Sequence, residues 1–258
     1  MSGNEICDDH TIRQLAGWLR DAQHVIAFTG AGVSTESGIP DFRSPGGVWS
    51  KTEPVYYEDF LQSAEARQEY WRQKSETHDG FLQGVPNVTH RALARWEQVG
   101  ILKGLITQNI DGLHRMAGSD NVLEIHGTAR EIGCLDCEAR YEADPLVQEF
   151  RRTNVLPDCP RCGGHLKHAT ISFGQALVPS VLEDSARWAG KSDLFLALGS
   201  SLVVHPAAGL PTIAKQSGGR LVIINRDSTP LDTTADLVLN TPMGETFEAL
   251  ERILRNDE

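Results

Sequence analysis

Four cysteines stand in two closely spaced pairs, Cys134 with Cys137 and Cys159 with Cys162. Each C-x-x-C pair forms a tight turn that can present two thiolates to one ion, and two such pairs complete the tetrahedral shell that Zn²⁺ prefers. Four thiolates leave no position open for water, so the pattern predicts one structural zinc ion. The alternative, a redox dithiol, needs only one pair and is less well matched by this spacing.

A glycine-rich segment at residues 30–43, GAGVSTESGIPDFR, directly follows a short apolar run. Small residues at the end of a strand let backbone N–H groups approach a pyrophosphate close to a helix N-terminus. Thr35 replaces the third glycine of the common dinucleotide-binding pattern, so the turn by itself fits a plain tight turn equally well. The continuation favours a nucleotide site, because Asp41, Phe42 and Arg43 place an acid, a ring and a guanidinium beside it.

Polar residues follow two other apolar runs. In TQNIDGLH, residues 107–114, Asn109 and Asp111 could bind a carboxamide or ribose hydroxyls, although a turn or a helix cap is the commoner role of these residue types. His126 follows the run at 122–125 and could act as a general base near neutral pH. Most single histidines are not catalytic, so this assignment depends on its context.

The elements that must position these residues alternate between apolar strands and amphipathic helices. Continuous apolar runs predict buried strands, and apolar residues spaced by three and four predict helices. Strands and helices in alternation predict a doubly wound α/β sheet that binds ligands at the carboxyl ends of its strands. The predicted strands are 24–29, 102–107, 194–198, 221–225 and 237–239, and the predicted helices are 11–22, 88–99, 178–189, 206–217 and 246–254.

Two stretches interrupt this alternation. One begins with the turn Ser44-Pro45-Gly46-Gly47 and continues as an aromatic-rich helical segment, and the other carries the four cysteines with little strand alternation. We expect both to be insertions that together form a smaller second domain. The predicted division is a Rossmann-like domain at 1–43, 86–127 and 169–258, a helical insert at 44–85 and a zinc-binding insert at 128–168.

The composition is that of an ordinary globular protein, with 258 residues, 40% hydrophobic residues and a net charge of −11. No block of Lys or Arg stands out, which argues against a nucleic-acid partner bound by phosphate neutralisation. No apolar run is long enough to cross a bilayer, and the first residues lack the basic start and apolar core of a signal peptide. We therefore expect a cytoplasmic protein without nucleic-acid or membrane partners.

Taken in order, these segments resemble the sirtuin family over nearly the whole chain, from about residue 11 to the last predicted helix. The resemblance is carried by GAGVSTESGIPDFR, TQNIDGLH, the pair His126-Gly127, both C-x-x-C pairs, the FG at 173–174, GSSLVVHPA and INRDSTP. It implies a Rossmann-like parallel sheet that binds NAD, with a smaller inserted module made of a zinc ribbon and helices. It also implies an enzyme that removes acyl groups from protein lysines and consumes NAD as a co-substrate.

The family reaction supplies the expected chemistry. The acyl carbonyl oxygen attacks the ribose carbon that bears nicotinamide, nicotinamide leaves, and a base then deprotonates a ribose hydroxyl that attacks the acyl carbon. The products are free lysine, nicotinamide and O-acyl-ADP-ribose. The expected partners are acyl-lysine proteins or peptides, the zinc ion is structural, and we expect a monomer. Two other functions stay open, a protein mono-ADP-ribosyltransferase that uses the same cleft and a non-catalytic NAD-sensing module.

The resemblance also assigns roles by position. The predicted catalytic residues are His126, as general base, with Asn109 and Asp111. The predicted metal ligands are Cys134, Cys137, Cys159 and Cys162. The predicted substrate-binding residues are Ile171, Phe173, Gly174 and Trp71. The residues assigned to NAD are Gly30, Ala31, Gly32, Ser34, Thr35, Asp41, Phe42, Arg43, Gln108, Asn109, Ile110, Asp111, Gly199, Ser200, Ser201, Asn225, Arg226 and Met243.

Three positions depart from the family pattern. Gln175 stands where an acid is common, which could change substrate contacts. Ser200-Ser201 replaces the more usual Thr-Ser, which should matter little because the hydroxyl is kept. Met243 replaces a small residue near the adenine and could crowd it.

The acyl preference is predicted from one helical stretch. In sirtuins that prefer succinyl or malonyl lysine, a Tyr and an Arg three residues later bind the acyl carboxylate. The corresponding residues here are Trp71 and Lys74, and a register shifted by one gives Tyr70 and Gln73. Trp71 would offer an apolar wall, and a lysine lacks the two-pronged grip of arginine, so we expect a preference for neutral acyl groups such as acetyl. The alternative is that these residues only pack the insert and that Lys74 points to solvent.

Overall fold

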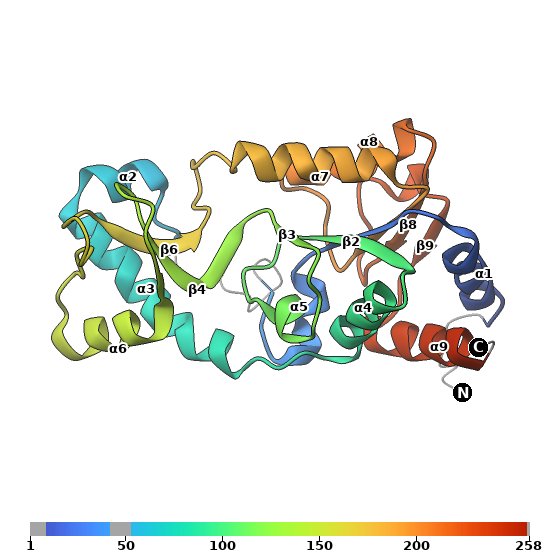
Figure 1. Ribbon diagram of the computed structural model, residues 1–258, viewed down its shortest axis with the longest axis horizontal. Coiled ribbons are helices and arrows are strands. Elements are labelled where there is room, and N and C mark those ends of the chain that lie inside the picture. Colours follow the sequence, from blue (N-terminus) through green and yellow to red (C-terminus); the bar gives the residue numbers. More distant parts are fainter. Residues whose placement is uncertain (1–8, 42–52, 257–258) are drawn as a thin grey trace.

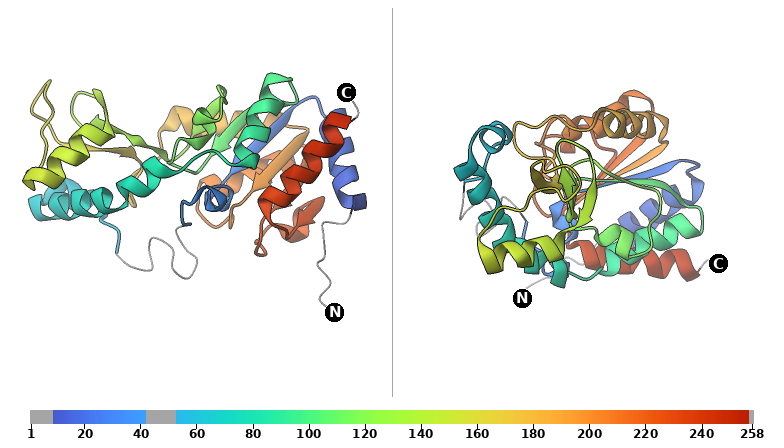
Figure 2. Two further views of the ribbon diagram at one scale, coloured as in Figure 1. Left: turned by 90° about the horizontal axis from the view of Figure 1, so that it is seen from below. Right: turned by 60° about the vertical axis from the view of Figure 1, so that its left-hand side comes forward.

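The computed structural model describes residues 9–41 and 53–256 (Figure 1). The molecule is elongated, with a large parallel sheet and its helices toward one end and a smaller unit toward the other (Figures 1 and 2). Phe42, Arg43 and the turn at 44–47 lie outside the described residues, so the NAD contacts assigned to the first two stay predictions.

The larger sheet contains six parallel strands in the spatial order β3-β2-β1-β7-β8-β9. The chain builds one half outward from β1 and then returns to the centre to build the other half from β7, which confirms the predicted doubly wound arrangement. The order reverses between β1 and β7, and such a reversal opens a crevice at the carboxyl edge of the sheet. The strands are β1 (Val25–Thr29), β2 (Leu102–Thr107), β3 (Val122–Glu124), β7 (Leu194–Leu198), β8 (Arg220–Ile224) and β9 (Leu237–Leu239).

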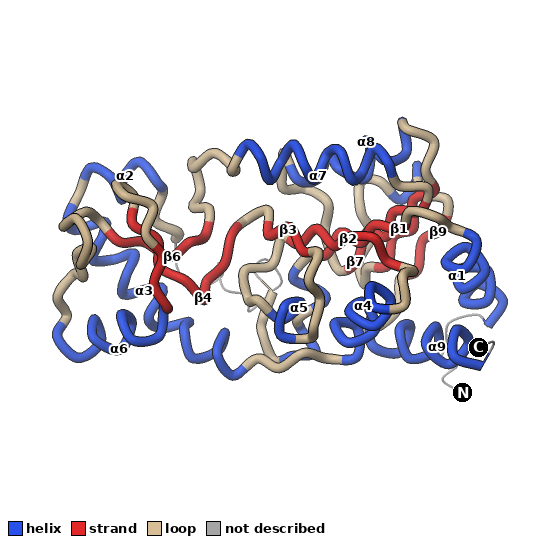
Figure 3. The backbone as a smooth tube through the Cα atoms, in the orientation of Figure 1, coloured by secondary structure: helices blue, strands red, loops and turns tan. Residues whose placement is uncertain are grey.

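Helices cover both faces of this sheet (Figures 1 and 3). Helix α1 (Asp9–Asp21) packs with α4 (Val88–Gln98) and α9 (Met243–Asn256) on one face, where Leu15, Leu93 and Phe247 share one buried cluster with the strands. Helices α7 (Pro179–Lys191) and α8 (Leu210–Gln216) cover the other face. The helix predicted at 206–217 is shorter than expected, because Ala207–Gly209 forms a 3₁₀ turn and Pro211 has to stand in the first turn of a helix.

The smaller unit is a three-stranded antiparallel sheet, in the order β5-β4-β6, covered by three helices. This arrangement agrees with the expected module of a zinc ribbon and helices. Its strands are partly exposed, which accounts for the weak alternation in the sequence, and α6 was not predicted although its buried residues stand at positions 143, 147 and 150. The elements are α2 (Tyr57–Gln62), α3 (Ala64–Gln83), β4 (Gly127–Cys134), β5 (Arg140–Glu142), α6 (Ala143–Thr153) and β6 (Leu166–Thr170), with the short α5 (Leu113–Met116) near the junction. The exact domain boundaries stay a prediction.

The core of the smaller unit forms around Trp71 of α3, whose side chain is 1% exposed. Its indole N–H donates to the carbonyl of Leu166 at 3.1 Å, which ties α3 to β6. Its ring lies 5.6 Å from that of Phe150 on α6. One side chain therefore joins the helical insert to the sheet of the cysteine-bearing insert. Within the described ranges, no helix is both long and apolar enough to cross a membrane.

We predict that Trp71→Ala destabilises the smaller unit by about 3–5 kcal/mol, because it leaves a cavity in the core and removes the bond to Leu166. Urea unfolding followed by far-UV circular dichroism measures the change. Glu76→Ala, an exposed position on the same helix, is the matched control and should change stability by less than about 0.5 kcal/mol. A Trp71→Ala protein as stable as the control would contradict the packing described here.

Candidate active site

A cavity of about 1240 Å³ is lined jointly by the loops at the carboxyl edge of the larger sheet and by α3 and β6 of the smaller unit. It exceeds the roughly 300–1,000 Å³ of common small-molecule pockets, so it has room for a dinucleotide and a peptide side chain together. The predicted site residues that line it are Gly30, Ala31, Gly32, Thr35, Asp41, Gln108, Asn109, Ile110, His126, Ile171, Phe173, Gly174, Gly199, Ser200, Ser201, Asn225, Arg226 and Met243. Ser34, Asp111 and Trp71 are not among the lining residues.

The glycines after β1 are required by a close approach of two loops. A Cβ on Gly30 would lie 2.7 Å from the carbonyl oxygen of Gly199, and a Cβ on Gly32 would lie 2.8 Å from the Cα of Gly199. The N–H of Gly30 donates to the carbonyl of Leu198, and that of Gly32 donates to the carbonyl of Gly199, both at 2.9 Å. These two N–H groups therefore join the β1 and β7 loops, and the pyrophosphate contacts expected of the segment 30–43 stay a prediction.

Behind the cavity wall, three polar side chains form a buried chain of hydrogen bonds. The carboxamide of Asn109 donates to the carbonyl of Gly30 and to the hydroxyl of Ser34, each at 3.1 Å. The hydroxyl of Ser34 in turn donates to a carboxylate oxygen of Asp111 at 2.7 Å. Only Asn109 reaches the cavity, so Ser34 and Asp111 hold it in place from behind.

Asp111 lies two residues before α5 and fixes the loop after β2. Its second carboxylate oxygen accepts the N–H of Leu113 at 2.9 Å. Burial raises the pKa of Asp111 above its ordinary value, and the bonds from Leu113 and Ser34 oppose that rise. Both hydrogen bonds require an acceptor, so they are strongest while the carboxyl is ionised.

Two further polar residues extend from this loop into the cavity. The side-chain amide of Gln108 donates to the hydroxyl of Ser200 at 2.8 Å, which connects the β2 and β7 loops. The Nδ1 of His126 lies 3.1 Å from the carbonyl of Gln108. Because a carbonyl only accepts, Nδ1 carries the proton, and the proton-accepting lone pair of the neutral ring is on Nε2.

The far end of the cavity is formed by the loop after β8 and the start of α9. The carboxamide of Asn225 donates to the carbonyl of Asp227 at 2.7 Å, and Met243 is buried at the first position of α9. A residue that the sequence analysis missed, Glu36, also lines this end and accepts the N–H of Gly244 at 2.9 Å. A carboxylate at a helix N-terminus is stabilised by the helix dipole. The presence of an acid at position 36 in the glycine-rich segment could have suggested this contact.

The substrate side is formed by the segment that follows β6. The N–H of Ile171 donates to the carbonyl of His126 at 2.9 Å, so the proposed base and this segment are held together. The carbonyl of Phe173 accepts the N–H of Tyr57, and the ring of Phe173 packs on that of Tyr56 at 5.9 Å. The side-chain amide oxygen of Gln175 accepts the N–H of Ser172. A carboxylate, which is common at this position in the family, could accept the same hydrogen bond.

The prediction that Trp71 forms a wall of the acyl-lysine site is wrong. Trp71 is buried in the core of the smaller unit, about 100° around α3 from the face that meets the cavity. That face carries Tyr70, Gln73, Lys74 and Thr77, which line the cavity. The spacing of three and four residues along α3 was the signal that could have identified this face. Lys74 lines the cavity as well, so it does not simply point to solvent.

The four cysteines meet at the end of the smaller unit, as predicted. Their sulfur atoms all lie within 4.8 Å of one another, and the pairs Cys134–Cys162 and Cys137–Cys159 are separated by 3.5 and 3.7 Å. Four sulfurs around one Zn²⁺ at about 2.3 Å would stand about 3.8 Å apart, so the arrangement fits a closed tetrahedral zinc site. The hydroxyl of Tyr141 lies 3.2 Å from the sulfur of Cys159 and can donate a hydrogen bond to its thiolate.

The doubly wound sheet, the cysteine-rich insert and the cavity between the two units agree with what comparisons of this chain with known proteins show. The Sir2 family model matches residues 30–206. An NAD-dependent protein deacetylase of Rhodopseudomonas palustris is 44% identical over 92% of this chain and 94% of its own length. NAD-dependent protein deacylase 1 of Archaeoglobus fulgidus is 38% identical over 92% of this chain and 95% of its own length. The chain therefore belongs to the Sir2, or sirtuin, family.

Solved structures agree with this assignment. A complex of Sir2 with a p53 peptide and NAD⁺ superposes with a TM-score of 0.84 at 34% identity, covering 95% of this chain and 98% of that one. A structure from a study of the mechanism and regulation of Sir2 enzymes gives a TM-score of 0.83 at 37% identity, covering 95% of this chain and all of the other.

We predict that the purified protein carries one zinc ion per chain and that Cys159→Ala loses it and unfolds the smaller sheet, because the free energy of metal binding contributes directly to folding of such a unit. Metal analysis together with hydrogen exchange of residues 127–170 measures both effects. His165→Ala, an exposed histidine beside the cluster, should keep the metal and serves as the control. A fully active, metal-free preparation would show that the zinc assignment is mistaken.

Proposed function

We propose that this sirtuin removes acyl groups from protein lysines and transfers them to ADP-ribose, with release of nicotinamide. The observation that carries the proposal is that one cavity joins Asn109 and His126 to the loops of the nucleotide-binding sheet and to the segment at Ile171. NAD, bound there as co-substrate, supplies a ribose carbon that becomes electrophilic as nicotinamide departs. The residues of the chain then have to orient the reactants, exclude water and move one proton.

His126 is suited to moving the proton. Its Nδ1 bond to the carbonyl of Gln108 fixes the ring orientation and leaves Nε2 as the nitrogen that accepts a proton. We assign Nε2 as the base that takes the proton of a ribose hydroxyl, which then attacks the acyl carbon. The bond from Ile171 to the carbonyl of His126 holds the proposed base next to the segment assigned to the acyl-lysine.

Asn109 is suited to orienting the nicotinamide half. Both of its amide hydrogens are used by Gly30 and Ser34, so the amide oxygen is the atom that can accept a hydrogen bond from a ligand in the cavity. We assign Asn109 to the step in which nicotinamide leaves, with Asp111 acting through Ser34 to keep its position. The zinc site is closed, and its role is to hold the smaller unit together.

We keep the remaining assignments as proposals. Gln108, Ser200, Asn225, Arg226 and Met243 are proposed to contact the ribose and adenosine parts of NAD, and Phe173 and Gly174 to contact the substrate peptide by added-strand pairing. A cytoplasmic location is proposed from the composition and can be tested by cell fractionation, and the proposed monomeric state can be tested by analytical ultracentrifugation. Mono-ADP-ribosyl transfer remains a second candidate because it would use the same cleft, and mass spectrometry of a reaction with NAD and an acetyl-lysine peptide distinguishes the two by product mass.

We predict that His126→Ala slows deacylation by about 10²–10⁴-fold while NAD still binds, because the base acts only after nicotinamide has left. Product formation and isothermal titration with NAD measure the two quantities separately. If NAD binding is lost together with activity, His126 is a structural residue and the assignment is wrong.

Asn109→Ala should affect the earlier step. We predict that it abolishes exchange of labelled nicotinamide into NAD in the presence of an acetyl-lysine peptide, because the reactive conformation of the nicotinamide ribose is no longer held. His126→Ala is the matched control and should retain the exchange. Equal exchange rates in wild type and Asn109→Ala would rule out the role given to Asn109.

A further inference from the structure

One lysine of α3 presents its amine to the cavity. Lys74 lines the cavity together with Tyr70, Thr77 and Phe81 of the same helix. Its side-chain nitrogen lies 5.5 Å from the centre of the Tyr70 ring, which is close enough for the amine to rest on the aromatic face. The amine therefore belongs to the wall that the smaller unit contributes to the cavity, where a bound molecule can touch it.

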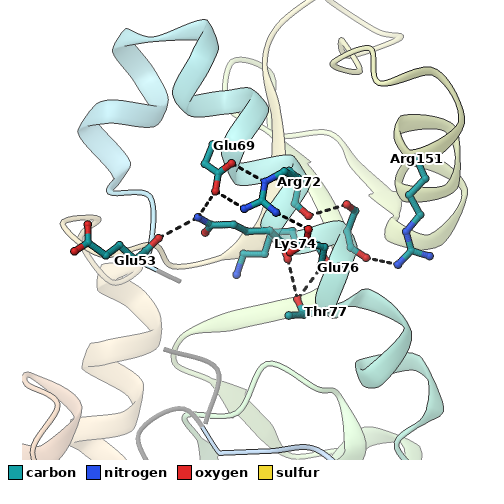
Figure 4. Close-up of polar contacts among 9 residues, drawn as sticks. Glu53, Glu69, Arg72, Lys74, Glu76, Thr77 and Arg151 are labelled. Carbon is teal, nitrogen blue, oxygen red and sulfur yellow. Dashed lines mark hydrogen bonds and ion pairs between the residues drawn. The ribbon is translucent and has the colours of Figure 1, made fainter. Parts of the chain in front are cut away.

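Within the ranges that the structure describes, no carboxylate forms an ion pair with this amine. The acids nearest to Lys74 along α3, Glu69 and Glu76, both pair with Arg72, at 2.6 and 2.5 Å, on the outer side of the helix. Figure 4 shows these pairs, and no dashed line reaches the amine of Lys74. A charged ammonium at this place would therefore lack both the water and the counter-ion that normally stabilise it.

These surroundings favour the neutral form of the amine. Burial lowers the pKa of Lys74 to about 8. An ordinary lysine, with a pKa of about 10.4, is neutral in about one molecule in 2,500 at pH 7, whereas an amine with a pKa of about 8 is neutral in about one in ten. The neutral amine is the form that attacks a carbonyl carbon, and desolvation is a known way to make a lysine nucleophilic.

Lys167 on β6 allows burial to be separated from access. Its side-chain nitrogen lies 5.6 Å from the centre of the same Tyr70 ring, and burial lowers its pKa to about 7, with a smaller contribution from the charge of Lys74. However, Lys167 is 2% exposed, does not line the cavity, and donates to the backbone carbonyls of His168 and Thr170. A small molecule in the cavity can therefore reach Lys74 but not Lys167.

We propose that Lys74 is a nucleophilic lysine and that small acyl phosphates acylate it from within the cavity. The lone pair of the neutral amine attacks the acyl carbon, and the bond between that carbon and the phosphate oxygen breaks. Inorganic phosphate leaves with the proton that the amine gives up, and an amide remains on Lys74. An acyl phosphate suits this wall because it is small and anionic, whereas the charged groups beside the Tyr70 ring are amines.

Acylation of Lys74 would act on the enzyme through the cavity. The added acyl group takes up space in the same cavity that Ile171 and His126 line, so it competes for room with a substrate acyl-lysine. We therefore expect deacylation to fall in proportion to the fraction of protein that is modified. This loss of activity rests on the deacylase function proposed above, whereas the modification itself does not depend on it.

The test treats the wild-type protein with acetyl phosphate in the absence of NAD and follows each lysine by peptide mass spectrometry. At pH 7 we expect Lys74 to be acetylated about 10–100-fold faster than Lys191, an exposed lysine at the end of α7, because its neutral fraction is larger. Lys167 should stay unmodified. The rate at Lys74 should rise as pH approaches its pKa of about 8 and level off above it, once the amine is neutral.

A second measurement connects the modification to activity. Each protein is compared with its own untreated sample, using an acetyl-lysine peptide and NAD after the acetyl phosphate has been removed. Wild type should lose activity in step with acetylation of Lys74, and Lys74→Arg should keep its activity because a guanidinium stays protonated and does not react. Lys191→Arg is the matched control, since it makes the same change at an exposed site, and it should lose activity as wild type does.

Acetylation of Lys74 that is no faster than that of Lys191 would overturn the inference. Faster reaction at Lys167 than at Lys74 would overturn it as well, because burial and not access from the cavity would then decide which amine reacts. Full acetylation of Lys74 without loss of activity would refute the inhibitory effect. If untreated wild type does not process the peptide in the presence of NAD, the proposed deacylase function fails, while mass spectrometry still decides whether Lys74 is nucleophilic.

Discussion

The site depends on one steric constraint, the contact between the loops that follow β1 and β7. Gly199 has a φ of +58° and would place a Cβ 2.5 Å from the backbone nitrogen of Val33, so neither loop can carry a side chain at the contact. The two backbone bonds from Gly30 and Gly32 close this contact at the reversal point of the sheet. Gln108, in the loop after β2, then donates to the carbonyl of Thr29 at the end of β1 and to the hydroxyl of Ser200 in the loop after β7, so this third loop is positioned by both.

The loop after β2 contributes to a buried polar network at the carboxyl edge of the sheet. Burying Asn109, Ser34 and Asp111 costs free energy unless every group is paired, and the bonds among them supply those partners. Their interdependence restricts Asn109 to one orientation, because turning its carboxamide would leave the Gly30 carbonyl and the Ser34 hydroxyl without their donor. The fixed orientation of Asn109 at the cavity wall therefore follows from the requirement that every buried group in this network has a hydrogen-bond partner.

Sequence patterns predicted the parts of the molecule in which local chemistry decides the structure. The parallel strands follow from continuous apolar runs, and the cysteine cluster follows from the C-x-x-C spacing. The sequence could not decide how α3 is rotated about its axis, or how deeply individual polar side chains lie below the cavity wall. A shift of one residue in the family alignment of α3 decides whether Trp71 or Tyr70 is assigned to the cavity. The helix carries many polar residues, so its pattern of apolar residues does not show clearly which side faces the cavity. Likewise, Ser34 and Asp111 were assigned to ligand contact, but tertiary packing places them one layer behind Asn109.

The distribution of charge shows why net charge says little about the site. The chain has a net charge of −11, yet Glu69 and Glu76 of α3 pair with Arg72 on its outer side, and the inner side faces Lys167 and His168 of β6. Exposed carboxylates are screened by water and salt, so they act weakly on the inner side of the helix, where the charge of Lys74 lowers the pKa of the buried Lys167. A helix whose acids Glu69 and Glu76 are paired on its outer side can present Lys74 to a cavity within an acidic protein.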